Sequence, residues 1–245
     1  THGHEDHLGA IPYLWSEIGC PIYGSAFTLA LLRRKLSEAR VDFEIPLNEI
    51  GMNMPFKLGA FEIEMVTLNH SIPDPAALVI RTDVGTILHT GDWKFDETPV
   101  LGNDTDRGRL AAIGDEGVLA VVGDSTNSMI DGCTGSENDA KEGLTNAIAN
   151  AKGRVAVTCF ASNVARIDSI CQAAKANGRS VSIVGRALTR AISAAQEVGY
   201  LVDLPDLVPE GDVDLLPRDA IVIVCTGSQG EPRAAMARIA SASHE

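Results

Sequence analysis

The chain has 245 residues, of which 45% are hydrophobic, and it contains 23 Gly and 11 Pro. This length and composition suit one large or two modest globular domains, and they exclude collagen-like, coiled-coil and disordered chains. Acidic residues outnumber basic ones by 33 to 20, and the net charge of −13 argues against a general nucleic-acid binder. No apolar run is long enough to span a membrane, and the first ten residues lack the features of a signal peptide.

The first half of the chain mixes helical and strand patterns. Two helical patterns between residues 8 and 40 flank a short strand at 21–25, and the first helix directly follows a histidine cluster. Residues 56–68 and 77–91 predict paired strands, because apolar side chains recur at nearly every second position. The apolar run at 118–122 predicts another strand.

The second half alternates strands and helices. Helices are expected at 137–150, 164–177, 188–199 and from about 231, with strands at 154–158, 180–184 and 220–225. This alternation predicts a parallel sheet in an α/β layer. The Ser-, Thr-, Gly- and Asn-rich stretch between them predicts a boundary, so we expect domains at 1–130 and 131–245.

Charge is unevenly distributed along the chain. Residues 151–200 contain seven bases and two acids, a local charge of +5 in an acidic protein. Such a window predicts either a basic face that steers an anionic substrate or a set of solvated helix faces. The five cysteines include no CxxC pair, which favours a reducing compartment, and we expect a cytoplasmic protein.

The chain begins with a dense cluster of metal-ligand residue types. His2, His4, Asp6 and His7 form the pattern H-x-H-x-D-H. Alternate residues of an extended segment face the same way, so His2 and His4 can share one ion. Asp6 and His7 then lie past the strand end, where a loop can turn them onto a second ion. Imidazole nitrogen and carboxylate oxygen are ligands that zinc accepts.

Two later residues each follow a predicted strand. His70 lies in LNHSIPD and Asp92 in LHTGD. Each alone is more typical of a cap or turn residue. Beside the first cluster they supply the missing ligands of a two-metal site, in which one carboxylate can bridge two ions.

Six stretches together resemble a known family. THGHEDHLGAIPYL, LNHSIPD and HTGDWKFD are similar to the metallo-β-lactamase superfamily. GDSTNS, FASNVARI and TGSQGEP resemble its β-CASP branch, of the ribonuclease J type. The resemblance implies an α/β fold, with a partial metallo-β-lactamase αββα sandwich followed by a β-CASP domain whose sheet is mainly parallel.

The resemblance also implies residue roles. His2, His4 and His70 would bind one Zn²⁺, Asp6 and His7 a second, and Asp92 would bridge them; Mn²⁺ suits the same ligands. The expected catalytic residues are Asp6, Asp92 and Asp124, the last supporting a catalytic histidine. The expected RNA-binding residues are Phe160, Ser162, Asn163, Arg186, Arg190, Ser228, Gln229 and Gly230.

By resemblance, the activity would be zinc-dependent hydrolysis of RNA phosphodiesters, 5′→3′ exo and/or endo, by a two-metal activated water in RNA processing and decay. The expected partner is 5′-monophosphorylated RNA. No membrane association is expected, and the intact protein would be a homo-oligomer. The family continues to two further histidine motifs, so we expect a fragment cut at both ends, with a weakened second metal site. Two alternatives remain: a small-molecule ester or thioester hydrolase, and a non-catalytic RNA-binding or assembly subunit.

Overall fold

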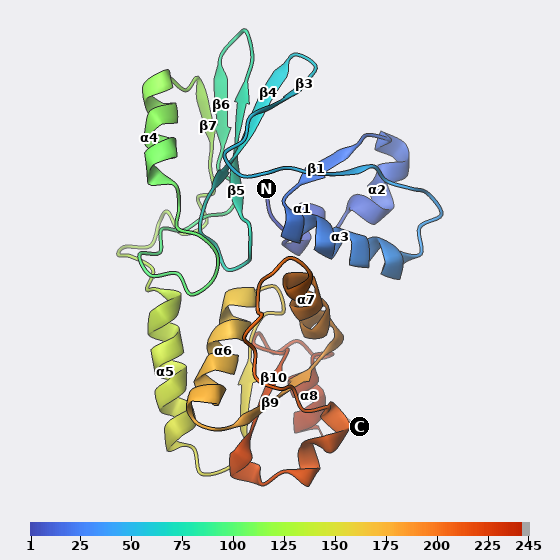
Figure 1. Cartoon of the computed structure of the whole chain (residues 1–245), viewed down its shortest axis with the longest axis vertical. Helices are drawn as coiled ribbons and strands as arrows, with labels where there is room; N and C mark the ends of the chain where they lie inside the picture. Colours follow the sequence, from blue (N-terminus) through green and yellow to red (C-terminus); the bar gives the residue numbers. More distant parts are fainter. Residues whose placement is uncertain (242–245) are drawn as a thin grey trace. The chain divides into compact units, whose positions relative to one another are not determined.

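The computed structural model describes residues 1–241, which divide into two compact units (Figure 1). Unit 1 comprises Thr1–Thr134, and unit 2 begins at Gly135. The expected domain boundary after residue 130 lies slightly before this division, in the irregular stretch between β7 and α5.

Unit 1 is built mainly around one sheet. In chain order its elements are α1 (Glu5–Leu8), α2 (Ile11–Ile18), β1 (Ile22–Gly24), α3 (Ala26–Ala39), β2 (Leu47–Glu49), β3 (Phe56–Leu58), β4 (Phe61–Thr67), β5 (Ala76–Arg81), β6 (Thr86–His89), α4 (Arg107–Glu116) and β7 (Ala120–Val122). The sheet has the order β3-β4-β5-β6-β7, and β1 and β2 form a separate parallel pair. The paired strands expected from the alternating pattern are confirmed.

The strand directions of this sheet bring two chain segments to one edge. β5 runs antiparallel to both β4 and β6, so β4 and β6 point the same way. Their carboxyl ends therefore lie at the same edge of the sheet, one strand apart. The segment after β4 carries His70, and the segment after β6 carries Asp92.

Two helices of unit 1 were missed from the sequence. α1 contains Asp6 and His7, so the expectation that these two residues lie in a loop is wrong. The helix starts here because Glu5 and Asp6 occupy its first turn, where acidic side chains stabilise a helix N-terminus. α4 has little apolar periodicity. It forms because the Asp106 side chain accepts a hydrogen bond from Arg109 N (2.8 Å) and because Ile113 is fully buried.

Unit 2 is an α/β layer around a parallel sheet with the order β8-β10-β9. Its elements are α5 (Glu137–Asn150), β8 (Val155–Thr158), α6 (Val164–Ala176), β9 (Ser180–Val184), α7 (Arg186–Glu197), the 3₁₀ turns η1 (Glu210–Leu215) and η2 (Arg218–Ala220), β10 (Ile221–Cys225) and α8 (Ala235–Ala240). The expected parallel sheet is confirmed.

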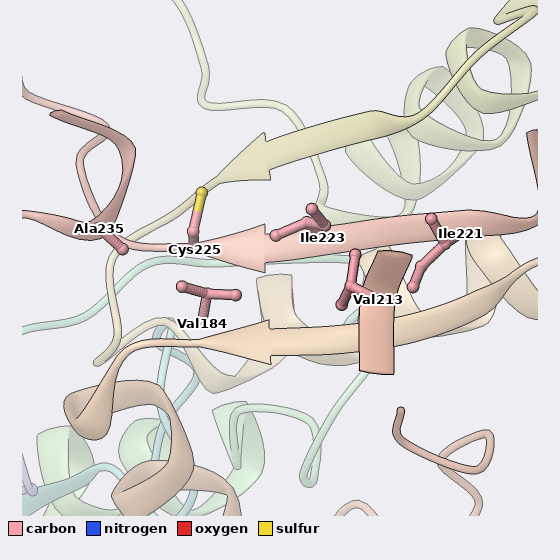
Figure 2. Close-up of a cluster of buried hydrophobic side chains, with 6 residues drawn as sticks. All are labelled: Val184, Val213, Ile221, Ile223, Cys225 and Ala235. Atoms are coloured by element: carbon pink, nitrogen blue, oxygen red, sulfur yellow. The ribbon is translucent and has the colours of Figure 1, made fainter. Parts of the chain in front are cut away.

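The central strand β10 is buried along its whole length. Figure 2 shows side chains from β9, β10 and η1 meeting on one side of the sheet. The cluster consists of Val184, Val213, Ile221, Ile223, Cys225 and Ala235. A strand hydrogen-bonded on both edges and apolar throughout is typical of a parallel sheet covered on both faces.

Two expectations about element ends need correction. The last helix begins at Ala235 rather than near residue 231, because the chain first makes turns with Gly227 and Gly230 at positive φ. The strand at 118–122 is shorter than expected and lies at the sheet edge, where Val121 and Val122 are more than half exposed.

Candidate metal centre

Three histidines from distant parts of unit 1 meet at the carboxyl edge of the sheet. His4 Nδ1 lies 3.0 Å from His2 Nε2 and 3.1 Å from His70 Nε2. His2 is buried, and His4 and His70 are half-buried. The three imidazoles therefore converge around one point, although residues 2 and 4 lie in an irregular segment before α1 and not in the strand expected.

Asp92 lies between two groups of histidines. Its Oδ2 is 3.7 Å from His2 Nε2 and 3.8 Å from His70 Nε2, whereas its Oδ1 is 3.3 Å from His7 Nε2. His7 Nε2 also lies 3.6 Å from Asp6 Oδ2. The two oxygens of one carboxylate thus point toward two different sets of ligand atoms.

These residues form two candidate donor sets that share Asp92. One is His2, His4, His70 and Asp92, and the other is Asp6, His7 and Asp92. Within each set, one ligand atom per residue can be chosen so that all lie within 4.8 Å of one another. Imidazole nitrogen and carboxylate oxygen match the donor chemistry of zinc, so the residues present fit divalent ions.

Three histidines of the first donor set, His2, His4 and His70, are favoured in the neutral form that metals require. Burial, followed by the neighbouring imidazoles, lowers the pKa of His2 to about 2. Burial and then His70 lower the pKa of His4 to about 4, and burial lowers the pKa of His70. Neutral imidazoles leave their lone pairs available for coordination without first losing a proton.

Asn69 is a positioning residue that the sequence analysis missed. Its side-chain Oδ1 accepts hydrogen bonds from Thr105 N (3.1 Å) and Thr105 Oγ1 (2.9 Å), and its Nδ2 donates to Asn103 O (2.6 Å). The two bonds from Thr105 are buried and the bond to Asn103 is partly buried; together they hold the turn that presents the neighbouring His70. Only the adjacency of Asn69 to His70 could have signalled this role.

Asp124 belongs to neither donor set. Its Oδ1 accepts hydrogen bonds from Thr126 N (2.9 Å) and Thr126 Oγ1 (2.6 Å), and its own N–H donates to Thr90 Oγ1. These bonds from Thr126 lower the pKa of Asp124, with smaller contributions from His70 and the backbone of Trp93. Asp124 is therefore an ionised group in the electrostatic field of His70.

Some of the expected RNA-binding residues of unit 2 are exposed, and others already form hydrogen bonds within the chain. Phe160 and Ser162 are exposed, but the Asn163 side chain caps α6 by accepting a hydrogen bond from Arg166 N (2.8 Å). Ser228, Gln229 and Gly230 lie in an exposed turn. The helix expected from about residue 231 begins only at Ala235, and Gln229 N already donates to Glu231 Oε2 (3.0 Å).

Three of the seven bases in the window at 151–200 form ion pairs with acidic residues outside it. Arg154 pairs with Asp214, Arg166 with Glu137, and Lys175 with Asp203, while the buried Arg179 donates to backbone carbonyls. The +5 window is therefore not a +5 face. Of the two arginines expected to bind RNA, Arg186 is exposed and Arg190 is half-buried.

Family models match both units. "Beta-lactamase superfamily domain" matches residues 1–108, and "Ribonuclease J, beta-CASP domain" matches residues 152–245. A ribonuclease J of Sinorhizobium meliloti is 46% identical over 240 residues, which is 98% of this chain and 43% of that protein. This chain belongs to the ribonuclease J family.

Other members of the ribonuclease J family match the whole chain. A ribonuclease J of Mycolicibacterium smegmatis is 44% identical and ribonuclease J2 of Bacillus subtilis is 37% identical, each over 100% of this chain and 44% of its own length. The chain spans less than half the length of these curated relatives. Membership implies a metallo-β-lactamase fold that uses divalent metal.

A comparison with a solved structure gives information about the fold but not about the function. A protein of unknown function from Enterococcus faecalis V583 superposes with a TM-score of 0.61 at 16% identity, over 85% of this chain and 54% of its own. Within residues 1–241, no helix of this ribonuclease J family member is both long and apolar enough to cross a membrane.

Proposed function

We propose that this chain forms the catalytic core of a metal-dependent ribonuclease that hydrolyses RNA phosphodiesters in RNA processing and decay. One observation supports this most: Asp92 joins two sets of nitrogen and oxygen donors, as a site for two ions requires. We propose two Zn²⁺ as the resident ions, and Mn²⁺ suits the same ligands. The proposal includes 5′→3′ exonuclease and endonuclease modes, 5′-monophosphorylated RNA as substrate, and homo-oligomers.

His2, His4 and His70 would hold one ion, Asp6 and His7 the other, and Asp92 both. When bound, such ions lower the pKa of water and offset the negative charge of a reacting phosphodiester. Burial lowers the pKa of His2, His4 and His70, which favours the neutral imidazoles that coordinate a metal. Asp6 and Asp92 are carboxylates that can accept a proton at this edge of the sheet.

Asp124 would act indirectly, by orienting a catalytic imidazole. It is ionised, half-buried and fixed by Thr126. A fixed carboxylate of this kind can orient an imidazole and stabilise its protonated form. In the α/β unit, the exposed Phe160 can stack on a base, and Arg186 can contact phosphate.

A cytoplasmic location is part of the same proposal. The structure shows five free cysteines, three of them buried. Burial raises the pKa of Cys159 and of Cys171 to about 12, so these thiols stay protonated and unreactive. This cysteine usage is consistent with a reducing compartment.

The test is cleavage of a 5′-monophosphorylated single-stranded RNA by the purified full-length protein, with and without EDTA. We expect cleavage that EDTA abolishes, that added Zn²⁺ or Mn²⁺ restores, and that Asp92→Asn removes. Hydrolysis of a chromogenic ester but not of RNA would instead support a small-molecule hydrolase. RNA binding that is indifferent to EDTA, without cleavage at any metal concentration, would support a non-catalytic subunit.

A further inference from the structure

Two exposed aromatic side chains directly follow the shared carboxylate Asp92. Trp93 is 37% exposed and Phe95 is 46% exposed. Their ring centroids lie 4.9 Å apart at an interplanar angle of 62°. Large aromatic side chains bury well, so an adjacent exposed pair beside a candidate catalytic centre requires an explanation.

The segment that carries this pair is anchored through Lys94, which forms an antiparallel bridge and an ion pair. Lys94 forms an antiparallel bridge with Asn69, in which Lys94 N donates to Asn69 O (3.0 Å). Lys94 also pairs with the buried Asp96 at 3.1 Å. Alternate side chains of an extended segment face opposite ways, so Lys94 and Asp96 anchor the segment while Trp93 and Phe95 face outward.

The backbone of Trp93 is tied to the candidate centre. Its N–H donates to the Asp124 carboxylate, and the preceding residue is Asp92. The bridge from Lys94 reaches Asn69, the residue before His70. The aromatic pair is therefore attached on both sides to segments that carry candidate metal ligands.

The surroundings of the pair favour bases over phosphates. The Arg107 guanidinium carbon lies 4.5 Å from the Phe95 ring centroid, but its Nη2 pairs with Glu97 at 2.5 Å. Arg107 also lines a cavity of about 340 Å³, whose charged lining is otherwise acidic: Asp96, Glu97, Asp104 and Asp106. An acidic lining repels phosphate, whereas an aromatic face attracts any nucleobase.

We propose that Trp93 and Phe95 form a stacking platform for an unpaired nucleobase of single-stranded RNA, next to the metal centre. The proposal rests on the proposed ribonuclease function and adds a binding site to it. Stacking is tolerant of sequence, so the platform positions the strand for cleavage without selecting a base. It contributes stacking rather than charge, so its contribution to RNA affinity is nearly independent of salt.

Tryptophan fluorescence tests the proposal directly, because the chain has only two tryptophans. The other, Trp15, stacks on Phe43 with a centroid distance of 5.1 Å and donates to Cys20 O. In the Trp15→Phe variant of this 245-residue chain, Trp93 is the only indole emitter. We expect a single-stranded RNA oligonucleotide, added with EDTA to prevent cleavage, to quench this emission saturably. The matched Trp93→Phe protein, which retains Trp15, should show no such quenching.

Affinity measurements separate stacking from charge. We expect Trp93→Ala to weaken RNA binding roughly tenfold, with an unchanged slope of log affinity against log salt. Trp93→Phe should restore most of the affinity, and both variants should retain the wild-type metal content. A lower salt slope in Trp93→Ala would overturn the proposal, because the residue would then act through phosphate contacts.

Two further outcomes distinguish this inference from the proposed function. Unchanged Trp93 emission in a protein that cleaves RNA would overturn the platform and leave the function standing. Quenching without metal-dependent cleavage would support the platform and contradict the function. Protection of Trp93 from acrylamide before RNA is added would also overturn the platform, because other protein surface would then cover it.

Discussion

The Nε2 atom of His7 lies 3.3 Å from Oδ1 of Asp92. The other oxygen of the same carboxylate faces His2 and His70. One aspartate therefore connects the short helix α1 with the ends of two strands. This arrangement explains why removing single ligands should have different consequences for the two donor sets.

His4→Ala should remove metal and abolish RNA cleavage while leaving unit 2 folded. His4 is the imidazole that lies within about 3.1 Å of both other histidines of its set. Elemental analysis, cleavage assays and proteolysis of residues 137–240 would measure the three effects. Retained activity in this variant would contradict the assignment of the site.

Asp6 and Glu5 provide a matched pair of carboxylates on α1. Asp6 belongs to the second donor set, whereas Glu5 pairs with Lys35 at the surface. We expect Asp6→Ala to lower the metal content from about two ions to one per chain, because a set left with two ligands binds weakly. Glu5→Ala should keep two ions. In the unchanged protein, the three-ligand set Asp6, His7 and Asp92 should lose its ion first as a chelator is titrated in. If Asp6→Ala and Glu5→Ala lost the same amount of metal, the second site would be contradicted.

The metal-free protein should lose stability as pH falls from about 7 to 4. The folded pKa of His2 is about 2 and that of His4 about 4, below the ordinary value of 6.5. Between these values the unfolded chain binds protons that the folded chain does not, so acid favours unfolding. Urea unfolding at a series of pH values, in EDTA, would measure this effect. His4→Gln should flatten the pH dependence, and an equally steep profile in that variant would refute the assigned cause.

Glu64 joins the sheet to α4 through two arginines. Its side chain is buried and accepts bonds from Arg109 Nε (2.6 Å) and Arg81 Nη1 (2.9 Å), which lower its pKa. Glu64→Gln should lower the free energy of unfolding by about 3 kcal/mol, because it leaves a buried ionic network incomplete. Glu62→Gln is the control: Glu62 is partly exposed and 3.9 Å from Arg81, so its loss should cost within about 0.5 kcal/mol. Equal Tm values for the two variants would show that the network adds no stability.

Replacing Arg186 and Arg190 should weaken RNA binding and reduce its salt dependence by roughly one unit of slope per lost phosphate contact. Lys175 and Arg154 serve as basic controls from the same unit, because neither is an expected RNA-binding residue, and their replacement should change the slope less; Lys175 pairs with Asp203 and Arg154 with Asp214. Filter binding across a range of salt concentrations would measure the slopes. An unchanged slope in the Arg186 and Arg190 double variant would assign these arginines to solvated helix faces.

Local patterns were sufficient to predict much of the fold. Period-two alternation predicted β4 and β5, and alternating strand and helix patterns predicted the parallel sheet of unit 2. α4 could not be predicted in this way, because it depends on a cap from Asp106 and on ion pairs with Glu64. The roles of the candidate site residues stay predictions until metal and RNA are measured.

The sequence by itself determined which residue types are available, since H-x-H-x-D-H concentrates ligand groups within a few positions. Only the tertiary structure decided that His70 and Asp92 join them, because this depends on β4 and β6 ending at the same sheet edge. It also decided that three bases of the basic window form ion pairs, because the partners Glu137, Asp203 and Asp214 lie outside that window in the sequence. Charge and ligand chemistry are local properties, whereas their pairing depends on contacts between residues far apart in the chain.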